Sequence, residues 1–395
     1  MCVCVCVRER EREREMERMM GNGGSGAIVY GVAMVLVVVM VALGDGAESA
    51  QKGAPGCIGE NGSPVDWFAV LKVPNGAMYA YIDPTMYEKD PTSAEWKVVE
   101  GKTLAENKGN AVAETLQQLY DDAGATLAYV QYNDQAPSGK KATSYQGHSK
   151  GVWATGEGGG FWLLHSVPRY PDAVSTSNGV YPGMPEYENR YGQSFLCLSL
   201  DTEKMDAVAE QFYYNRAAIF DFKEVPELTP RLPNFTKFVQ GAYSKDPVTN
   251  EVDITTRSGK FHFTSFAKTH YWDDYMYLQL VAEKFDTNLL VETWMNGINP
   301  DPTFCKGSDY KYSIMNVRHV AVADDLYGSI DWKETQDHSK WCVSTDSTPG
   351  TKVACIGDIN RQRSQNGRPG GTVCIENEAL WTAFTKAIID YDQCS

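Results

Sequence analysis

The tripeptide His-Ser-Lys occurs twice in this sequence, at positions 148–150 and 338–340. In an extended segment, residues i and i+2 point to the same face, so each copy presents an imidazole beside an ammonium group. This pair suits a phosphate, because lysine supplies charge for a nonbridging oxygen and histidine can act as nucleophile or proton donor. Two copies, one from each half of the chain, predict a fold in which the halves meet at one symmetric site. The alternative is that both copies are surface turns with solvated lysines and incidental histidines.

The first 50 residues differ in composition from the rest of the chain. Residues 1–20 alternate Cys-Val and then Arg-Glu, and residues 27–43 form an uncharged, mainly apolar segment. That segment is short for a membrane-spanning helix but suits the hydrophobic core of a signal peptide. We therefore expect residues 1–50 to be a low-complexity leader with a signal peptide, and the mature protein to have no stable membrane anchor.

Cysteine usage agrees with export. Three of the ten cysteines lie in the leader, and the other seven contain no Cys-x-x-Cys pair, which argues against zinc ribbons and thioredoxin-type redox chemistry. In an oxidising compartment, seven cysteines are expected to form three disulfides and to leave one free thiol. Asn234 opens a clear N-glycosylation motif, and Asn61 opens a weaker one because Pro64 follows it.

The composition beyond the leader is that of a folded globular protein. The 395 residues are 43% hydrophobic and 22% charged, which excludes wholesale disorder and fibrous repeats. The net charge of −15 argues against a general nucleic-acid coat protein at neutral pH. We expect two halves, 51–240 with the first tripeptide and 241–395 with the second.

Hydrophobic patterning predicts interspersed strands and helices. Strands are expected at 126–132, 161–167, 195–200 and 312–322, and helices at 110–121 and 380–391. The expected class is therefore mixed α/β or α+β.

The remaining candidate ligands have simpler explanations. Three further histidines lie among aromatic or aliphatic residues and are expected at packing or surface positions: His262, His270 and His319. Adjacent Asp pairs point in different directions on helices and strands, so solvated faces are expected rather than metal sites. Residues 21–26 match a dinucleotide-binding glycine pattern, but no strand precedes them. We expect neither a metal nor another cofactor.

The segments around the tripeptides extend into longer motifs. These are GHSKG at 147–151, GGGFWLLHSVP at 158–168, DHSKWC at 337–342 and CIGDINR at 355–361. Others follow in order along the chain: GSPVDWF at 62–68, YNDQ at 132–135, YGQSFLC at 191–197, SFAK at 265–268 and GGTVC at 370–374. With these motifs, residues 57–394 resemble the deoxyribonuclease II family of acid endonucleases.

The resemblance implies a mixed α/β fold similar to the phospholipase D superfamily, with two pseudo-twofold-related halves that share one active site. That superfamily carries His-x-Lys and a polar residue seventeen positions after the histidine. Here that position is His165, where Asn is usual, and in the second half Asn360 comes 22 residues after His338. The superfamily's downstream Asp is not evident in either half.

The chemistry of a phosphodiester assigns roles to these residues. Its poor leaving group favours a covalent intermediate, which needs a nucleophile and a separate acid. We expect His148 as nucleophile and His338 as general acid, although the two could be exchanged. The supporting residues are expected to be Lys150 and Lys340 for the phosphate oxygens, and His165 and Asn360 for phosphate orientation.

The family resemblance also implies a disulfide pattern. The pairs would be Cys57–Cys197, Cys305–Cys394 and Cys342–Cys374, with Cys355 left as a free, inert thiol.

The leading interpretation is a lysosomal or secreted endonuclease that hydrolyses double-stranded DNA without metal, through a phosphohistidine, to 3′-phosphate and 5′-hydroxyl ends. Protonation of histidines and carboxylates makes the protein less negative as pH falls, so a bell-shaped profile on the acid side of neutrality is expected. The alternatives are a phosphodiesterase acting on RNA or phospholipid, and an inactive or toxin-like secreted binding protein on the same scaffold.

Overall fold

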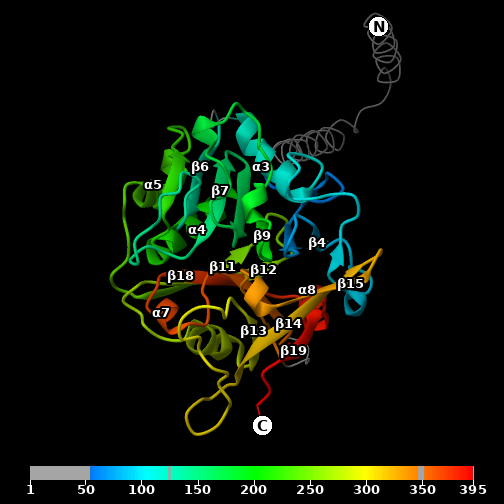
Figure 1. Cartoon of the computed structure of the whole chain (residues 1–395). Helices are drawn as coiled ribbons and strands as arrows, with labels where there is room; N and C mark the ends of the chain where they lie inside the picture. Colours follow the sequence, from blue (N-terminus) through cyan, green and yellow to red (C-terminus); the bar gives the residue numbers. More distant parts are fainter. Residues whose placement is uncertain (1–53, 123–125, 346–350, 395) are drawn as a thin grey trace, which may run out of the picture. The chain divides into compact units, whose positions relative to one another are not determined.

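The computed structural model describes residues 54–122, 126–345 and 351–394 (Figure 1). The expected leader, including its apolar segment 27–43, lies outside these residues. Within the described part, no helix is long and apolar enough to cross a membrane.

The first group of strands forms an antiparallel sheet in the order β10-β6-β7-β8-β9-β3-β4-β5. The strands are β3 (Trp67–Lys72), β4 (Tyr79–Ile82), β5 (Lys97–Val98), β6 (Ala128–Asn133), β7 (Lys150–Gly156), β8 (Gly159–His165), β9 (Gln193–Leu200) and β10 (Ile219–Lys223). A separate short hairpin joins β1 (Cys57–Ile58) to β2 (Pro64–Val65).

The second group follows the order β11-β12-β18-β17-β16-β13-β14, with β15 and β19 also paired to β14. The strands are β11 (Thr249–Thr255), β12 (His262–Lys268), β13 (Leu289–Glu292), β14 (Ile314–Asp324), β15 (Gly328–Lys333), β16 (Trp341–Ser344), β17 (Val353–Gly357), β18 (Gly370–Glu376) and β19 (Ile388–Tyr391). A single parallel pairing of β14 with β5 joins the two groups.

Five strands repeat the same antiparallel order in each group. The order β3-β9-β8-β7-β6 in the first group corresponds to β12-β18-β17-β16-β13 in the second. One tripeptide leads into β7 and the other into β16, which are equivalent strands of the two groups. The repeated order therefore brings the two His-Ser-Lys copies to matching positions.

Helices cover both groups of strands. The α-helices are α3 (Ala111–Asp122), α4 (Thr202–Asn215), α5 (Pro233–Val239), α6 (Glu283–Phe285), α7 (Arg363–Asn366) and α8 (Glu378–Ala387), and a π-helical turn η5 (Tyr277–Ala282) precedes α6. Short 3₁₀ turns are η1 (Pro91–Ser93), η2 (Val174–Thr176), η3 (Glu186–Glu188), η4 (Thr229–Arg231) and η6 (Glu334–Gln336). Helix α4 contacts β7 and β8 of the first group and β11 and β12 of the second, so it lies between the groups.

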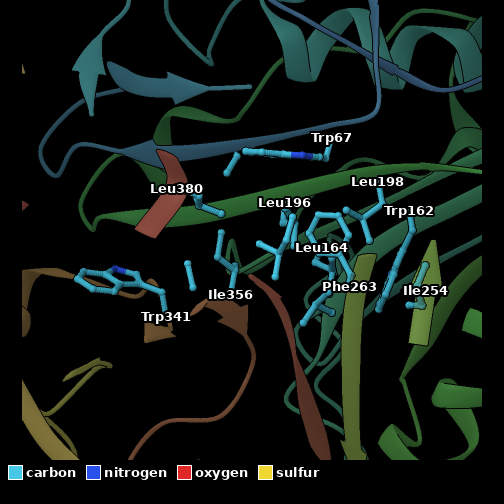
Figure 2. Packing of buried hydrophobic residues seen from close by; sticks show 14 of the residues in the cluster. Trp67, Trp162, Leu164, Leu196, Leu198, Ile254, Phe263, Trp341, Ile356 and Leu380 are labelled. Carbon is cyan, nitrogen blue, oxygen red and sulfur yellow. The ribbon is translucent and has the colours of Figure 1, made fainter. Parts of the chain in front are cut away.

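The largest hydrophobic core is shared by both groups of strands (Figure 2). Trp67 and Leu198 from the first group are part of the same cluster as Phe263 and Ile356 from the second. The opposite face of each group packs separately, against α3 in the first and against η5 in the second. Most strand residues are consequently buried on both faces of the sheet, which holds the strand ends that carry the tripeptides in fixed positions.

The sequence-based elements are mostly confirmed, with one error at the C-terminus. Helix α3 and strands β6, β8, β9 and β14 lie where they were expected. The predicted helix 380–391 ends at Ala387, because Ile388 is extended (φ −77°, ψ 115°) and begins β19. Tyr391 pairs with Val317 of β14, so the i, i+4 spacing of apolar residues continued by coincidence into a strand.

Two of the three expected disulfides are confirmed, Cys57–Cys197 and Cys305–Cys394. The third expectation is wrong: Cys355 pairs with Cys374, and Cys342 is the free thiol. The three cysteines lie in register on adjacent strands, with Cys355 of β17 between the other two. Cys342 and Cys374 are thus two strand spacings apart, about 9–10 Å, which is beyond the reach of a disulfide. Burial raises the pKa of the Cys342 thiol, so it is an inert core residue as had been expected for Cys355.

Candidate active site

Each tripeptide is held by a carbonyl group of the opposite half of the chain. The backbone N–H of His148 donates to the carbonyl oxygen of Pro369 (2.9 Å), and that of His338 donates to the carbonyl oxygen of Gly192 (2.8 Å). Pro369 directly precedes β18 and Gly192 directly precedes β9, which are equivalent strands. The two halves therefore build one site by exchanging matching hydrogen bonds.

Two glycines allow this close approach. A Cβ on Gly147 would lie 2.2 Å from the carbonyl oxygen of Asn215 at the end of α4. A Cβ on Gly192 would lie 2.6 Å from the Asp337 carboxylate, which in turn accepts from the Ser339 N–H (2.8 Å) and the Trp332 Nε1–H (2.7 Å). A side chain at either position would push a tripeptide out of place.

The ring of His148 is held by a backbone carbonyl group from the other half of the chain. Its Nδ1 lies 2.8 Å from the carbonyl oxygen of Asp358. Because a carbonyl oxygen can only accept, Nδ1 carries the hydrogen and Nε2 keeps its lone pair. Burial, together with the charge of Lys150, lowers the pKa of His148 well below its ordinary value, against the opposing effect of Asp134. The neutral form of the imidazole is therefore favoured.

The ring of His338 is fixed by aromatic packing. It stacks on Tyr191 (centroids 4.1 Å apart, planes at 16°) and meets Trp294 edge-on (4.4 Å, 84°). Burial and the nearby positive charges of Lys340 and Lys150 lower the pKa of His338 to about 3. A bound phosphodiester would place a negative charge here and raise that pKa.

The two lysines of the tripeptides make the same internal contact. Each Nζ donates to the carbonyl oxygen of the histidine in its own tripeptide, at 3.1 Å for Lys150 and 2.5 Å for Lys340. Burial lowers the pKa of Lys340 to about 7, and the charge of Lys150 adds to that effect. The mutual influence of these groups agrees with one site that contains both tripeptides.

Three groups missed by sequence reasoning complete the site. Asp134 forms ion pairs with Lys150 (2.5 Å) and Arg368 (2.8 Å), and lies 3.9 Å from Nε2 of His148. Burial raises the pKa of Asp134, but Lys150, His148 and Arg368 outweigh it and hold that pKa well below the usual range. Burial raises the pKa of Asp358 to about 7, against the opposing charges of Lys150 and Lys340.

His165 and Asn360 differ in their relation to the site. His165 ends β8 beside Lys150, since Gly151 pairs with Leu164. Its two ring nitrogens are buried without a hydrogen-bond partner, and burial followed by the charge of Lys150 lowers its pKa to about 3. In the described part of the chain, no hydrogen bond or ion pair joins Asn360 to either tripeptide. Gly357, whose N–H donates to the carbonyl of Lys340 (2.9 Å), occupies the place equivalent to His165.

The other candidates lie outside this arrangement. His319 forms an exposed ion pair with Asp331 (2.8 Å), and exposed His262 contacts Thr255. Among the described residues, no group of three or more His, Cys, Asp or Glu is placed to hold a metal ion.

Residues 56–394 match the family described as Deoxyribonuclease II. The chain belongs to the deoxyribonuclease II family. Deoxyribonuclease-2-alpha of Rattus norvegicus is 34% identical over 345 residues, 84% of this chain and 92% of the rat protein. Plancitoxin-1 of Acanthaster planci is 33% identical, covering 87% of this chain and 93% of its own length. Cell death-related nuclease 6 of Caenorhabditis elegans is 30% identical, covering 86% and 89%.

In this deoxyribonuclease II family member, two equivalent buried lysines support the segments that hold the tripeptides. Lys268 ends β12, and its Nζ donates to the carbonyl oxygens of Gln365 (3.4 Å), Asn366 (2.5 Å) and Arg368 (2.6 Å). Lys72 ends β3, and its Nζ donates to three carbonyls, at Val73 (2.9 Å), Gly76 (2.7 Å) and Asn189 (2.9 Å). Lys268 thus holds the segment before Pro369, whose carbonyl group binds the first tripeptide. Lys72 holds the segment before Gly192, whose carbonyl group binds the second.

Replacing Lys268 with methionine is expected to lower kcat for DNA by about tenfold or more. The change leaves three carbonyls without their donor and loosens the segment that carries Arg368 and Pro369. The measurement is kcat and KM on plasmid DNA, at a temperature where circular dichroism shows a folded variant. Lys284→Met, which removes an exposed lysine paired with Glu251, is the matched control. A folded Lys268→Met variant with the kcat of the wild type would contradict the bracing role.

Proposed function

We propose that this protein is an acid endonuclease that hydrolyses DNA phosphodiesters without metal, through a covalent phosphohistidine on His148. The observation that carries the proposal is the orientation of His148, whose Nδ1–H is held by the Asp358 carbonyl and whose Nε2 is left as nucleophile. The substrate class rests on the family and on the names of its members, which include deoxyribonuclease-2-alpha.

In the proposed first step, Nε2 of His148 attacks phosphorus while the bond to O5′ breaks. His338 gives its proton to that oxygen, so one product leaves with a 5′-hydroxyl group. The phosphate stays on the 3′-oxygen of the other strand fragment and is bonded to His148. In the second step, water attacks phosphorus, the P–N bond breaks and His338 takes the proton from the water. The second product carries a 3′-phosphate, and both histidines return to their starting state.

Positive charge around His148 supports the same reaction. Lys150, Lys340 and Arg368 can stabilise the nonbridging oxygens as charge develops, a task that a metal ion performs in other nucleases. Asp134 holds Lys150 and Arg368 in place through its two ion pairs. The ring of His165 is buried against Tyr170 and Phe195, so for His165, as for Asn360, phosphate orientation stays a prediction.

The repeated strand order supports a phospholipase D-like fold with two pseudo-twofold-related halves. The halves meet at 240–241 in our proposal, and the chain passes from the first group of strands to the second between α5 and β11. The exchange of hydrogen bonds by His148 and His338 is what such an axis would produce.

The expected leader and the disulfides support a lysosomal or secreted location. The three disulfides suit an oxidising compartment. Of the two proposed glycosylation sites, Asn61 is exposed and Asn234 is half-buried in the first turn of α5.

DNA cleavage is expected to survive millimolar EDTA at pH 5. The cationic groups named above belong to the protein and are not removed by a chelator. The purified protein is incubated with plasmid DNA, RNA and phospholipid vesicles, each with EDTA and with EDTA plus excess Mg²⁺. The proposal expects DNA cleavage in both conditions. Cleavage restored only by Mg²⁺ would contradict the mechanism. Faster cleavage of RNA or phospholipid than of DNA would mean that DNA is not the main substrate. Inactivity on all three would favour a binding protein or toxin on this scaffold.

A further inference from the structure

Three exposed tyrosines and three cationic or titratable side chains adjoin the first tripeptide. The side chains, together called the tyrosine patch, are Tyr145, Arg216, Tyr243, Lys245, His270 and Tyr271. The tyrosines are 59%, 38% and 49% exposed for Tyr145, Tyr243 and Tyr271. Large aromatic side chains at the surface are unusual enough to indicate a contact surface when they gather in one place.

The patch consists of two clusters of ring contacts. The ring of His270 meets Tyr145 edge-on (5.2 Å between centroids) and lies against Tyr271 (3.8 Å). The guanidinium of Arg216 lies 4.3 Å from the ring centroid of Tyr243, and Nζ of Lys245 lies 5.6 Å from the same ring. Arg216 also acts electrostatically on His270, where, after burial, it contributes to the lowered pKa of that histidine.

The backbone connects the patch to the nucleophile. The backbone carbonyl oxygen of Arg216 accepts a hydrogen bond from the N–H of Gly147 (3.1 Å), the residue before His148. The backbone carbonyl oxygen of Gln146, next to Tyr145, accepts a hydrogen bond from Nε of Arg368 (3.4 Å). Nη2 of the same arginine donates to the carboxylate of Asp134. A polymer with its phosphate at His148 would therefore meet these rings with its neighbouring nucleotides.

The chemistry of the patch fits a nucleic-acid strand. Tyrosine rings stack on bases and sugars without regard to sequence, while Arg216 and Lys245 can pair with phosphates. Three acids lie close by in the sequence: Asp273 pairs with Arg363, Asp274 accepts the Tyr275 N–H, and Asp246 is exposed next to Lys245. A protein of net charge −15 needs such a local cationic surface to hold DNA.

We propose that the tyrosine patch is a subsite that binds the DNA strand next to the scissile phosphate, by stacking on its tyrosines and by ion pairs to its arginine and lysine. The inference rests on the proposed function. It assigns substrate affinity, and not bond breaking, to these six residues.

The test compares a 30-nucleotide DNA with bis(p-nitrophenyl) phosphate, a diester too small to span both the patch and the site. In the triple variant Tyr145→Ala, Tyr243→Ala, Tyr271→Ala, KM for the oligonucleotide is expected to rise at least about tenfold. The effect on the small diester should be much smaller. Tyr327→Ala is the matched control, because Tyr327 is 74% exposed at the turn between β14 and β15.

A second variant tests the ionic part. Removing Arg216 and Lys245 by alanine substitution is expected to lower the salt dependence of oligonucleotide KM, because fewer phosphates are neutralised. Wild-type KM for DNA in both variants would overturn the inference while leaving the proposed function intact. Failure of the wild-type protein to cleave either substrate would instead overturn the proposed function.

Discussion

Alanine at His148 or at His338 is expected to reduce DNA cleavage by about 10³-fold or more at pH 5. Loss of His148 removes the nucleophile, and loss of His338 leaves the O5′ leaving group without a proton donor. Initial rates on plasmid and oligonucleotide DNA measure the effect, with circular dichroism to show that each variant is folded. His262→Ala is a suitable control, since His262 is exposed on β12 and contacts only Thr255 in the described structure.

The assignment of the two histidines depends on both variants. Activity within tenfold of wild type in either variant would show that the histidine in question is not part of the chemical step. A nearly full rate in both would mean that the tripeptides bind phosphate without reacting.

Cleavage is expected to be fastest on the acid side of neutrality and to fall by about tenfold or more between pH 5 and pH 8. Burial lowers the pKa of Lys340 to about 7, so its ammonium form is complete at pH 5 and is lost as pH rises through that value. Burial raises the pKa of Asp358 to about 7, so its carboxyl group is neutral at pH 5 and becomes negative over the same range. Both changes make the site less attractive to phosphate as pH rises. Burial also lowers the pKa of His148, which favours the neutral imidazole that the proposed attack needs.

Asp358→Asn separates the two contributions. The substitution removes the titrating carboxyl group and keeps the backbone carbonyl that holds Nδ1 of His148. In this variant the alkaline limb of the kcat/KM profile is expected to become less steep, because Lys340 titrates without Asp358. It is also expected to move to lower pH, because the charge of Asp358 no longer raises the pKa of Lys340. An optimum at pH 7.5–8 in the wild-type protein would contradict the electrostatic account and would favour a metal-using nuclease.

The repeated tripeptide was enough to predict where the candidate site lies, because its spacing rule is local. Residues i and i+2 are fixed by the backbone, so His148 and Lys150 can be recognised without knowing the rest of the fold. His165 came from the superfamily pattern that the resemblance implies, seventeen positions after His148. In the second half the insertion before Asn360 broke that rule, and the structure places Gly357 at the matching position.

The partners of these groups could not be found from local spacing. Asp134 and Arg368 are 234 residues apart, and His148 reaches a backbone carbonyl of Asp358 that any residue type could supply. The third disulfide failed for a related reason. Cys342, Cys355 and Cys374 lie in register on three neighbouring strands, and only the strand order shows that Cys355 lies in the middle.

The sequence-based account of acid activity was wrong about its source. It assumed that all the histidines would gain a proton near their ordinary pKa. Burial lowers that pKa for His148, His165 and His338, so the site does not gain positive charge from them. Lys340, Asp358 and the bracing Lys268 each have a pKa of about 7, which lies in the range that matters.

The central claim is that the two tripeptides form one site that passes the phosphate through a histidine. The most direct measurement is to react the protein with DNA at pH 5 in EDTA, to quench rapidly with alkali, and to map the modified peptide by mass spectrometry. The account predicts a 3′-phosphonucleotide bonded to His148, which accumulates in the His338→Ala variant when the substrate carries an activated leaving group that needs no acid. Modification of the wild-type protein at His338 alone would mean that His338 is the nucleophile and His148 the acid. Absence of any histidine adduct, together with products that carry 5′-phosphate ends, would contradict the account.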